Sequence, residues 1–167
     1  MEEIVMCTER IKFKKLQLKY AKVMIDLINN PKIYNYIHRE HVDFTLDDEV
    51  KWITEHINDC IYSMFLDDEQ FVGNCGFNEI SDGVGTISIF IAPEFQNQGL
   101  GFEVLTKLID YGFNELHLEE INLDVFSHNE RAIRCYRKLG FEEYKRDHDV
   151  CVRDGNKVDS IYMKIKK

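Results

Sequence analysis

The sequence predicts one α/β domain in which helices flank a mixed, mostly antiparallel sheet. Short runs of β-branched and aromatic residues alternate along the chain with amphipathic segments of helical period. No internal repeat, low-complexity tract or linker interrupts this alternation, so residues 1–167 are interpreted as a single domain. An apolar content of 44% is sufficient for a hydrophobic core.

The net charge of -9 argues against nonspecific nucleic-acid binding, because a protein needs a basic surface to neutralise phosphates. An acidic surface attracts cationic small molecules instead, although solubility alone explains the same charge equally well. The five cysteines are scattered without a Cys-x-x-Cys pair, which indicates a reducing compartment and neither a disulfide framework nor a zinc site. Without a long apolar run or a signal-like N-terminus, the sequence predicts a cytoplasmic protein that does not enter a membrane.

A strand and a helix are predicted before residue 31. The strand alternates, with one slip, at Ile11, Phe13, Leu16 and Leu18. The helix begins near Tyr20 and ends at Asn30-Pro31, because the residue before a proline avoids helical angles. Residues 34–44 lose the periodic pattern and are predicted to form a loop or a short helix.

A second helix is predicted to begin at Thr45, which forms a capping box with Asp48. Its buried side is expected to carry Leu46, Val50, Ile53 and Ile57. Strands at 61–66 and 70–77 follow, and the turn at 81–83 leads into the next strand.

Residues 85–112 organise the rest of the chain. Residues 86–91 have strand composition, and Pro93 ends the strand because proline has no N–H for a ladder. Gly99 and Gly101 then precede an apolar helical stripe at Val104, Leu105, Leu108 and Ile109. A strand, a glycine loop and a helix N-terminus direct free backbone N–H groups at an anion. The spacing lacks the Lys-Ser/Thr of a P-loop and the third glycine of the dinucleotide fingerprint.

The C-terminal part is predicted to contain a strand at 121–126, a helix and a hairpin. Ser127 and Glu130 are expected to form the capping box of the helix, which ends at Gly140. The hairpin strands at 141–152 and 158–165 are joined at Asp154-Gly155-Asn156.

Two motifs carry a family resemblance. Gln96-Asn97-Gln98-Gly99-Leu100-Gly101, directly after a strand ending in Ala-Pro-Glu, resembles the Gln/Arg-x-x-Gly-x-Gly/Ala loop of the GNAT superfamily of acetyl-CoA-dependent N-acetyltransferases. Residues 129–141 match a second pattern of that family, Asn-x-x-Ala-x-x-x-Tyr-x-x-x-Gly-Phe, in the family's order. Residues 72–77 and 154–163 look most like the RimJ/RimL-type branch and its spermidine N-acetyltransferase relatives.

The resemblance implies acetyl transfer from acetyl-CoA to a primary amine by direct attack in a ternary complex. Backbone groups of Ile89 and Ile91 would pair with the pantetheine arm, and Asn129 would support the cofactor. Tyr136 would lie near the sulfur as general acid, whereas its helical position alone favours a core aromatic. The pyrophosphate would be held by the amides of Gln96, Asn97, Gln98, Gly99, Leu100, Gly101 and Phe102.

The loop departs from the family pattern at two positions. Family loops often carry a glycine and a basic residue where Asn97 and Gln98 stand. Asparagine tolerates left-handed angles, so the loop can still form, while the lost charge weakens the attraction of phosphate. Basic residues nearby could compensate, although solvated helix faces explain them more simply: Lys107, Arg131, Arg134, Arg137 and Lys138.

Glu79, at the end of the strand beside the central one, is the candidate general base, and an ordinary turn-flanking carboxylate is the simpler interpretation. His128 is a rival base but is expected to be structural within a capping turn. His38 and His41 have a metal-like spacing without supporting ligands, so no metal site is predicted.

The favoured acceptor is a small polyamine-like cation. Acidic residues lie between the first two helices, a region that borders the acceptor site in the family: Glu40, Asp43, Asp47, Asp48 and Glu49. Helix-dipole complementarity explains the last three of these without any substrate. A protein N-terminal amine, an amino sugar or an aminoglycoside are the alternatives, as is a non-catalytic acyl-CoA-binding sensor. The resemblance leaves a homodimer open.

Overall fold

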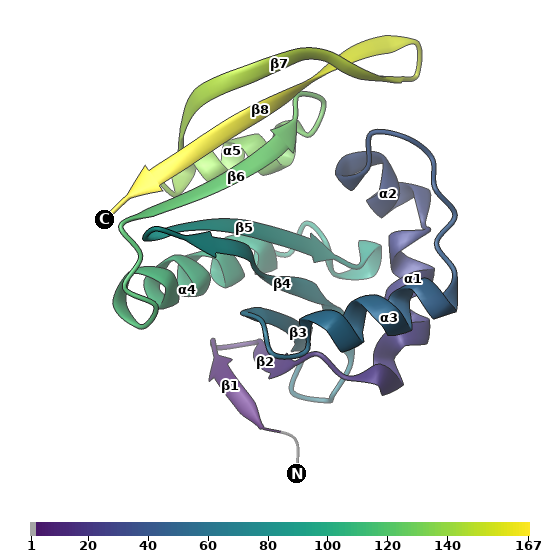
Figure 1. Cartoon of the computed structure of the whole chain (residues 1–167), viewed down its shortest axis with the longest axis vertical. Helices are drawn as coiled ribbons and strands as arrows, with labels where there is room; N and C mark the ends of the chain where they lie inside the picture. Colours follow the sequence, from purple (N-terminus) through teal and green to yellow (C-terminus); the bar gives the residue numbers. More distant parts are fainter. Residues whose placement is uncertain (1–2) are drawn as a thin grey trace.

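Eight strands form a single sheet in the computed structural model of the chain, which describes residues 3–167. Their order across the sheet is β1-β2-β3-β4-β5-β6-β8-β7 (Figure 1). Only β5 and β6 are parallel neighbours, which confirms the predicted mixed, mostly antiparallel sheet. The strands are β1 (Ile4–Cys7), β2 (Lys12–Lys15), β3 (Ile61–Phe65), β4 (Phe71–Ser81), β5 (Val84–Ile91), β6 (Glu120–Phe126), β7 (Glu142–Arg153) and β8 (Asn156–Lys166).

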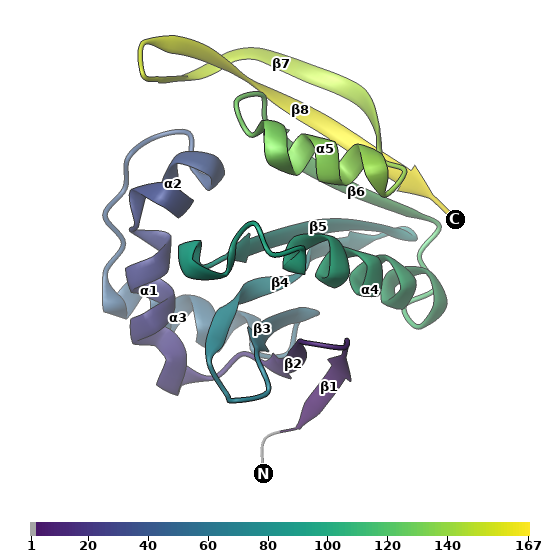
Figure 2. The same ribbon diagram turned by 180° about the vertical axis from the view of Figure 1, so that it is seen from behind.

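Helices cover both faces of the sheet. Seen from behind, α4 and α5 lie in front of the strands, whereas α3 lies on the opposite face with α1 and α2 beside it (Figures 1 and 2). No helix of the described residues has the length and apolar character that a membrane span requires. The helices are α1 (Ala21–Ile28), α2 (Pro31–Ile37), α3 (Leu46–His56), α4 (Leu100–Asn114) and α5 (Glu130–Lys138).

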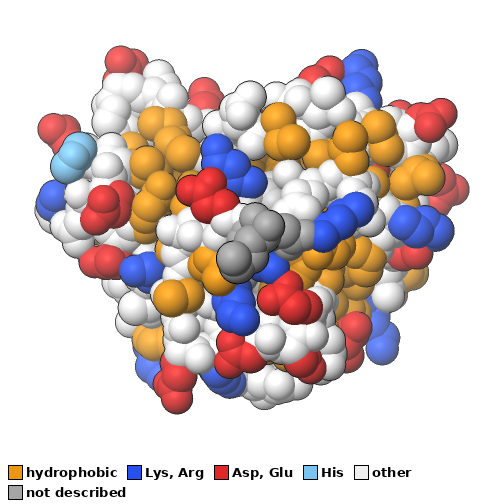
Figure 3. All heavy atoms as spheres, turned by 90° about the horizontal axis from the view of Figure 1, so that it is seen from below, with side chains coloured by type: hydrophobic (Ala, Val, Ile, Leu, Met, Phe, Trp, Pro, Cys, Tyr) orange, Lys and Arg blue, Asp and Glu red, His pale blue; other side chains and the backbone are white. Residues whose placement is uncertain are grey.

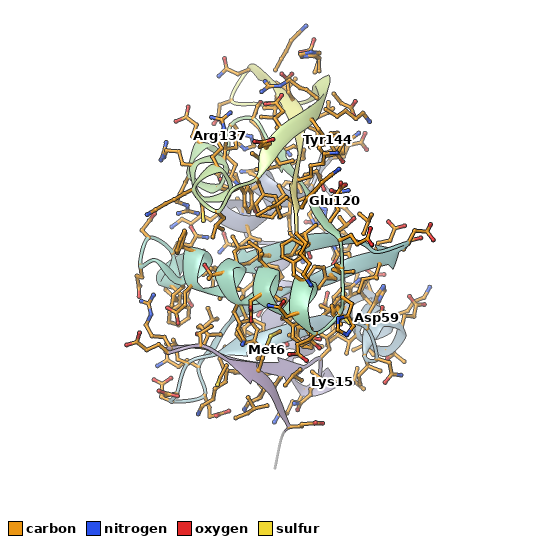
Figure 4. All side chains as sticks on the ribbon, turned by 90° about the vertical axis from the view of Figure 1, so that its left-hand side faces the viewer. Met6, Lys15, Asp59, Glu120, Arg137 and Tyr144 are labelled. Carbon is orange, nitrogen blue, oxygen red and sulfur yellow. The ribbon has the colours of Figure 1, made fainter. Side chains whose placement is uncertain are left out.

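The main core lies between the sheet and α4, where two glycines permit close packing. A Cβ atom on Gly85 would lie 2.6 Å from Leu118 Cδ1, and one on Gly112 would lie 2.8 Å from Phe77 Cζ. Any larger side chain at either position would displace the core. Met6 extends this core to the sheet edge beneath α4, as Figure 4 shows.

β5 and β6 pair over a short distance only, which leaves part of β5 unpaired. Only Val84, Gly85 and Thr86 pair with β6, although β5 continues to Ile91. Beyond Thr86, therefore, the edge of β5 that faces β6 has no strand partner in the described part of the chain.

The N-terminal third contains a strand that the sequence did not predict, β1, and a short helix, α2, which is one of the two forms predicted for residues 34–44. β1 pairs with β2 at the sheet edge. α2 begins directly at Pro31, with Asn30 as its N-cap accepting a hydrogen bond from the Lys32 amide at 2.9 Å. The Asn-Pro pair thus ends one helix, as predicted, and also begins the next, because proline at the first helical position is already preorganised.

The predicted capping box of α3 is confirmed, but three of the four residues predicted for its buried side are exposed. The Thr45 hydroxyl accepts from the Asp48 amide at 3.2 Å, and the Asp48 carboxylate accepts from the Thr45 amide at 2.8 Å. Ile53 is fully buried, whereas Leu46, Val50 and Ile57 are 45%, 37% and 36% exposed. The helix lies at the surface and contacts the core through a narrow face only.

A second capping box was also wrongly predicted. Asn129, and not Ser127, caps α5 by accepting from the Ala132 amide at 3.3 Å. The Ser127 hydroxyl instead accepts from the Asp159 amide of β8 at 2.9 Å. The C-terminal signals are confirmed, because Gly140 has φ of 100° after α5 and the β7–β8 hairpin turns at Asp154 and Gly155.

The surface carries charges of both signs. On the face shown in Figure 3, Lys and Arg side chains alternate with Asp and Glu side chains around small hydrophobic patches, so this face has no patch of a single sign.

Candidate active site

A cavity of about 910 Å³ opens where β5 and β6 diverge. Its walls come from α2 and α3 on one face of the sheet and from α4 and α5 on the other, with β4, β5 and β6 between them. The cavity therefore connects the two faces of the sheet, and a molecule on one side can reach a molecule on the other.

The loop between β5 and α4 has left-handed backbone angles at two positions. Asn97 has φ of 60° and Gly99 has φ of 78°, as the tolerance of asparagine for this region allows. The Gln96 side-chain amide donates to the Ile91 carbonyl at 2.8 Å, and the Gln98 side-chain amide donates to the Glu94 carbonyl at 3.0 Å. Both glutamine side chains thus hold the loop in shape.

The first turn of α4 forms part of the cavity wall through Leu100, Gly101 and Phe102. Amides of a first helical turn have no partner within the helix, and the positive end of the helix dipole lies there. A Cβ atom on Gly101 would meet nothing closer than Ile91 Cδ1 at 3.7 Å, and its φ is not left-handed. The fold itself does not require glycine at this position, so the missing side chain leaves space for a ligand.

Arg131 supplies positive charge beside this loop. Its guanidinium donates to Asn97 Oδ1 and to Gln96 Oε1, both at 3.0 Å. Arg131 also lines the cavity, whereas Arg134 is exposed and pairs with Glu130 at 3.7 Å. Among the basic residues weighed from the sequence, Arg131 is the one that the structure places against both the loop and the cavity.

The unpaired edge of β5 offers backbone hydrogen bonds. The Ala92 amide donates to the Val72 carbonyl on the β4 side at 2.8 Å. Because successive residues of a strand direct their backbone groups to opposite sides, Ile91 and Ile89 face the open edge. The Gln96 side chain already occupies the Ile91 carbonyl, which leaves the groups of Ile89 available to an extended ligand.

Tyr136 projects from α5 into the cavity wall with 9% of its surface exposed. Its ring packs edge-on against Phe141, and its hydroxyl has no hydrogen-bond partner among residues 3–167. Burial raises the Tyr136 pKa, and the nearby Cys135 and Asp124 add to the shift. The hydroxyl therefore stays protonated at neutral pH and is available as a proton donor.

The structure separates the four other titratable residues weighed from the sequence, which are Glu79, His128, His38 and His41. Glu79 is exposed and does not line the cavity, whereas its neighbour Asn78, at the register shift between Phe77 and Glu79, does. His128 stacks on Tyr36 at 4.8 Å and lies with His41 in a separate cavity of about 400 Å³. His38 alone of the histidine pair lines the main cavity, and burial lowers its pKa. Within residues 3–167, no group of three or more His, Cys, Asp or Glu side chains could hold a metal ion.

Glu49 is the functional candidate whose position the sequence reasoning did not foresee. It is 5% exposed, lines the cavity from α3, and its Oε1 atom is buried without a hydrogen-bond partner. Burial raises its pKa to about 7. A signal was present in the sequence, because Glu49 precedes the buried Ile53 by four residues and so shares its helical face.

The other acidic residues of this region differ from Glu49. Glu40, Asp43 and Asp47 are exposed and lie outside the cavity wall. Asp48 lines the cavity, but Thr45 holds its carboxylate in the capping box.

Asn74 adds an unpaired donor to the cavity. Its Oδ1 accepts from the Ser63 hydroxyl at 3.1 Å, and its Nδ2 is buried without a partner. The side chain is only 4% exposed and lines the cavity, so its amide N–H groups are available to an acceptor atom of a ligand.

A profile of the acetyltransferase (GNAT) domain matches residues 10–142 of the chain. The chain belongs to the GNAT family. It is an N-acetyltransferase, and its acetyl donor is acetyl-CoA. The backbone amides at the N-terminus of α4, beside the open space at Gly101, fit the phosphates of such a donor. The unpaired edge of β5 at Ile89 fits an extended arm that carries amides.

Comparisons with known proteins support the family and the fold. The uncharacterized N-acetyltransferase p20 of Bacillus licheniformis is 27% identical over 166 residues, which cover 93% of this GNAT chain and 92% of the relative. The spermidine N(1)-acetyltransferase of Escherichia coli K12 is 47% identical over 53 residues, 32% of this chain and 28% of the relative. The crystal structure of the spermidine N-acetyltransferase of Vibrio cholerae, in complex with CoA and spermine, has the same fold. Its TM-score is 0.86 at 24% identity, covering 95% of this chain and 96% of that one.

Proposed function

We propose that this acetyltransferase acetylates a primary amine of a small polyamine-like cation. The observation that carries the proposal is the cavity-facing side of α3, where three carboxylates, Asp48, Glu49 and Glu55, outnumber the one cation, Lys51, which lies 3.9 Å from Glu55. Asp48 and Glu55 are seven residues apart, or about 10 Å along the helix. An extended molecule with several ammonium groups can meet carboxylates at both ends of this row, whereas a molecule with one positive charge can meet only one.

Other features of the protein support a cationic acceptor. Aromatic faces suit ammonium groups, and Tyr36, Phe44 and Trp52 line the same side of the cavity. The net charge of -9 raises the local concentration of cations. Spermidine appears in the names of a sequence relative and of a structural neighbour.

The donor is assigned to the opposite side of the cavity. The amides of residues 96–102 hold the pyrophosphate, with Arg131 keeping Gln96 and Asn97 in place. The backbone groups of Ile89 and the Ile91 N–H pair with the pantetheine arm. Asn129 supports the cofactor indirectly, since its side chain fixes the N-terminus of α5.

Tyr136 is assigned as the general acid. Acetyl-CoA, when bound, supplies a thioester whose carbonyl carbon is open to attack by an amine. The Tyr136 hydroxyl has no competing partner within the described residues and remains protonated, so it can give its proton to the departing sulfur.

Asn74 favours a second candidate acceptor. A ligand oxygen would satisfy its buried Nδ2, and a simple polyamine carries no oxygen. An amine with an oxygen near the reacting nitrogen, such as an amino sugar or an amino acid, would fill this position.

Release of free thiol from acetyl-CoA distinguishes these acceptors. The panel contains spermine, spermidine and putrescine, butylamine as the single-charge control, and glucosamine and an amino acid as oxygen-bearing amines. The proposal predicts that kcat/KM increases with the number of ammonium groups. Preference for glucosamine or the amino acid would favour the second candidate, and equal rates with spermine and butylamine would overturn the proposal.

A further inference from the structure

We propose that Glu49 is the general base of the reaction, taking a proton from the acceptor ammonium group so that the nitrogen can attack. The proposal rests on the amine-acetylating activity of the family and not on which amine is the acceptor. The residue that the sequence favoured as the base, Glu79, lies outside the cavity.

The position of Glu49 matches the path of the acceptor. The glycine loop, the N-terminus of α4 and Tyr136 form the wall on one face of the sheet, and the donor occupies that side. The acceptor must then approach through the opposite part of the cavity, between α2 and α3. Glu49 is on α3 and faces this part, so an amine that reaches the opening between β5 and β6 passes its carboxylate.

The environment of Glu49 leaves its carboxylate available to a substrate. A buried carboxylate oxygen without a partner reduces stability, because nothing replaces the water that it loses on folding. An incoming ammonium group supplies the missing partner and is itself a proton donor. Neither hydrogen bonding nor an ion pair in the free protein competes for Oε1 within the described residues.

The other carboxylates of the cavity are less suited to this role. Asp48 accepts hydrogen bonds from the Thr45 amide and hydroxyl, which lower its pKa and weaken it as a base. Glu55 is exposed at the far end of α3. Asp124 of β6 is also exposed, and its charge contributes to the raised pKa of Tyr136.

The pKa of Glu49 is raised by one cause, which is the burial of its carboxylate. Charged or titratable groups face the same cavity from α2, from α3 itself and from β6, and none of them contributes to the shift: Lys32, His38, Asp48, Lys51, Glu55 and Asp124. With a pKa of about 7, the side chain is partly ionised at neutral pH and can take and release a proton within each catalytic cycle.

Every proton of the acceptor ammonium group has a destination in this reaction. Glu49 takes one proton from the ammonium nitrogen, which then forms the C–N bond while the C–S bond breaks. Tyr136 gives its proton to the sulfur, and the second nitrogen proton restores the hydroxyl through solvent. Glu49 releases its proton to water after the acetylated amine departs, so each turnover yields one amide, one thiol and one proton.

The pH dependence of kcat in Glu49→Gln tests the proposal with whichever panel amine is turned over. The proposal predicts that kcat falls by about 10²–10⁴-fold, that the acidic limb near pH 7 disappears, and that acetyl-CoA still binds. Glu49→Asp should restore part of kcat. Asp47→Asn, an exposed change on the same helix, serves as the control with unchanged kcat. An unchanged acidic limb in Glu49→Gln, or its loss in Asp124→Asn instead, would overturn the proposal.

A titration of the ligand-free protein gives a readout that needs no substrate. Carbon-13 NMR of the glutamate carboxyls should show one resonance that titrates near pH 7 and is missing from Glu49→Gln. If all glutamate resonances titrate below pH 5.5, Glu49 is not the base. This result is independent of the amine panel, so a failure of the polyamine proposal and a failure of the Glu49 proposal are distinguishable.

Discussion

Glu49 and Ile53 lie one turn apart on the same buried face of α3, with 5% and 0% of their surfaces exposed. Ile53 anchors the helix to a small core that includes Leu16 and Met24. Because the anchor fixes the rotation of the helix, it also fixes Glu49 against the cavity. The packing of Ile53 therefore offsets the unfavourable free energy of burying the Glu49 carboxylate.

The stability of the protein should depend on pH through Glu49. Its pKa in the folded state, about 7, is raised above the ordinary 4.5, so the folded state binds the proton more tightly than the unfolded state does. This contribution is fully present below pH 4.5 and is lost as the pH rises through 7. Glu49→Gln should therefore gain on the order of 2 kcal/mol over the wild type at pH 8, after allowing for screening by water in the cavity. Urea unfolding at pH 4.5 and pH 8 measures it, and an equal difference at both pH values would contradict the assignment.

Removing the Tyr136 hydroxyl should affect turnover and leave donor binding intact. Tyr136→Phe keeps the ring that packs against Phe141, so the fold is expected to be unchanged. We expect kcat to fall by at least about tenfold with a nearly unchanged Kd for acetyl-CoA. Stopped-flow kinetics and calorimetry measure the two quantities, and full turnover in the variant would exclude Tyr136 from the mechanism.

A side chain larger than that of alanine at position 101 should block the ligand and leave the fold intact. A Cβ atom at this position has room inside the protein, so Gly101→Ala should bind acetyl-CoA normally and gain about 0.5–1 kcal/mol of stability. Gly101→Leu would fill the space in the cavity wall and should raise the Kd for acetyl-CoA at least about tenfold. Calorimetry tests both, with Tm as the control for folding. Tight binding by Gly101→Leu would place the phosphates elsewhere.

Arg131 should act through the loop that it holds. Arg131→Ala loses the hydrogen bonds to Gln96 and Asn97 and should raise the KM for acetyl-CoA several-fold, with kcat at saturation unchanged. Arg134→Ala, which removes an exposed cation from the same helix, is the matched control. Similar effects in both variants would indicate a general loss of positive charge and no specific role for the loop.

Glu79 remains the base that the sequence favoured, and its exposed position predicts a negative result. Glu79→Gln should leave the pH–rate profile unchanged, because the side chain does not line the cavity. If the variant instead requires a higher pH for full activity, Glu79 acts on the amine through water and Glu49 does not act alone.

The sequence predicts the donor side of the site better than the acceptor side. The loop at 96–101 and the helix that carries Tyr136 depend on local signals, namely glycines, a proline and helical periodicity, and these signals survive in the fold. The acceptor side depends on how α2 and α3 pack against the sheet, which is tertiary information. Leu46 and Val50 were therefore predicted to be core residues, whereas Glu49 faces inward beside Ile53.

The ratio of kcat/KM for spermine over butylamine, measured in the wild type and in Glu55→Lys, tests the central claim most directly. Glu55 ends the row of carboxylates that α3 presents to the cavity, far from the first helical turn. The account predicts a high ratio in the wild type and a fall of at least about tenfold in Glu55→Lys, with kcat/KM for butylamine nearly unchanged. A ratio close to one in the wild type, or a ratio that the substitution leaves unaltered, would contradict the claim that this cavity recognises a polyamine-like cation.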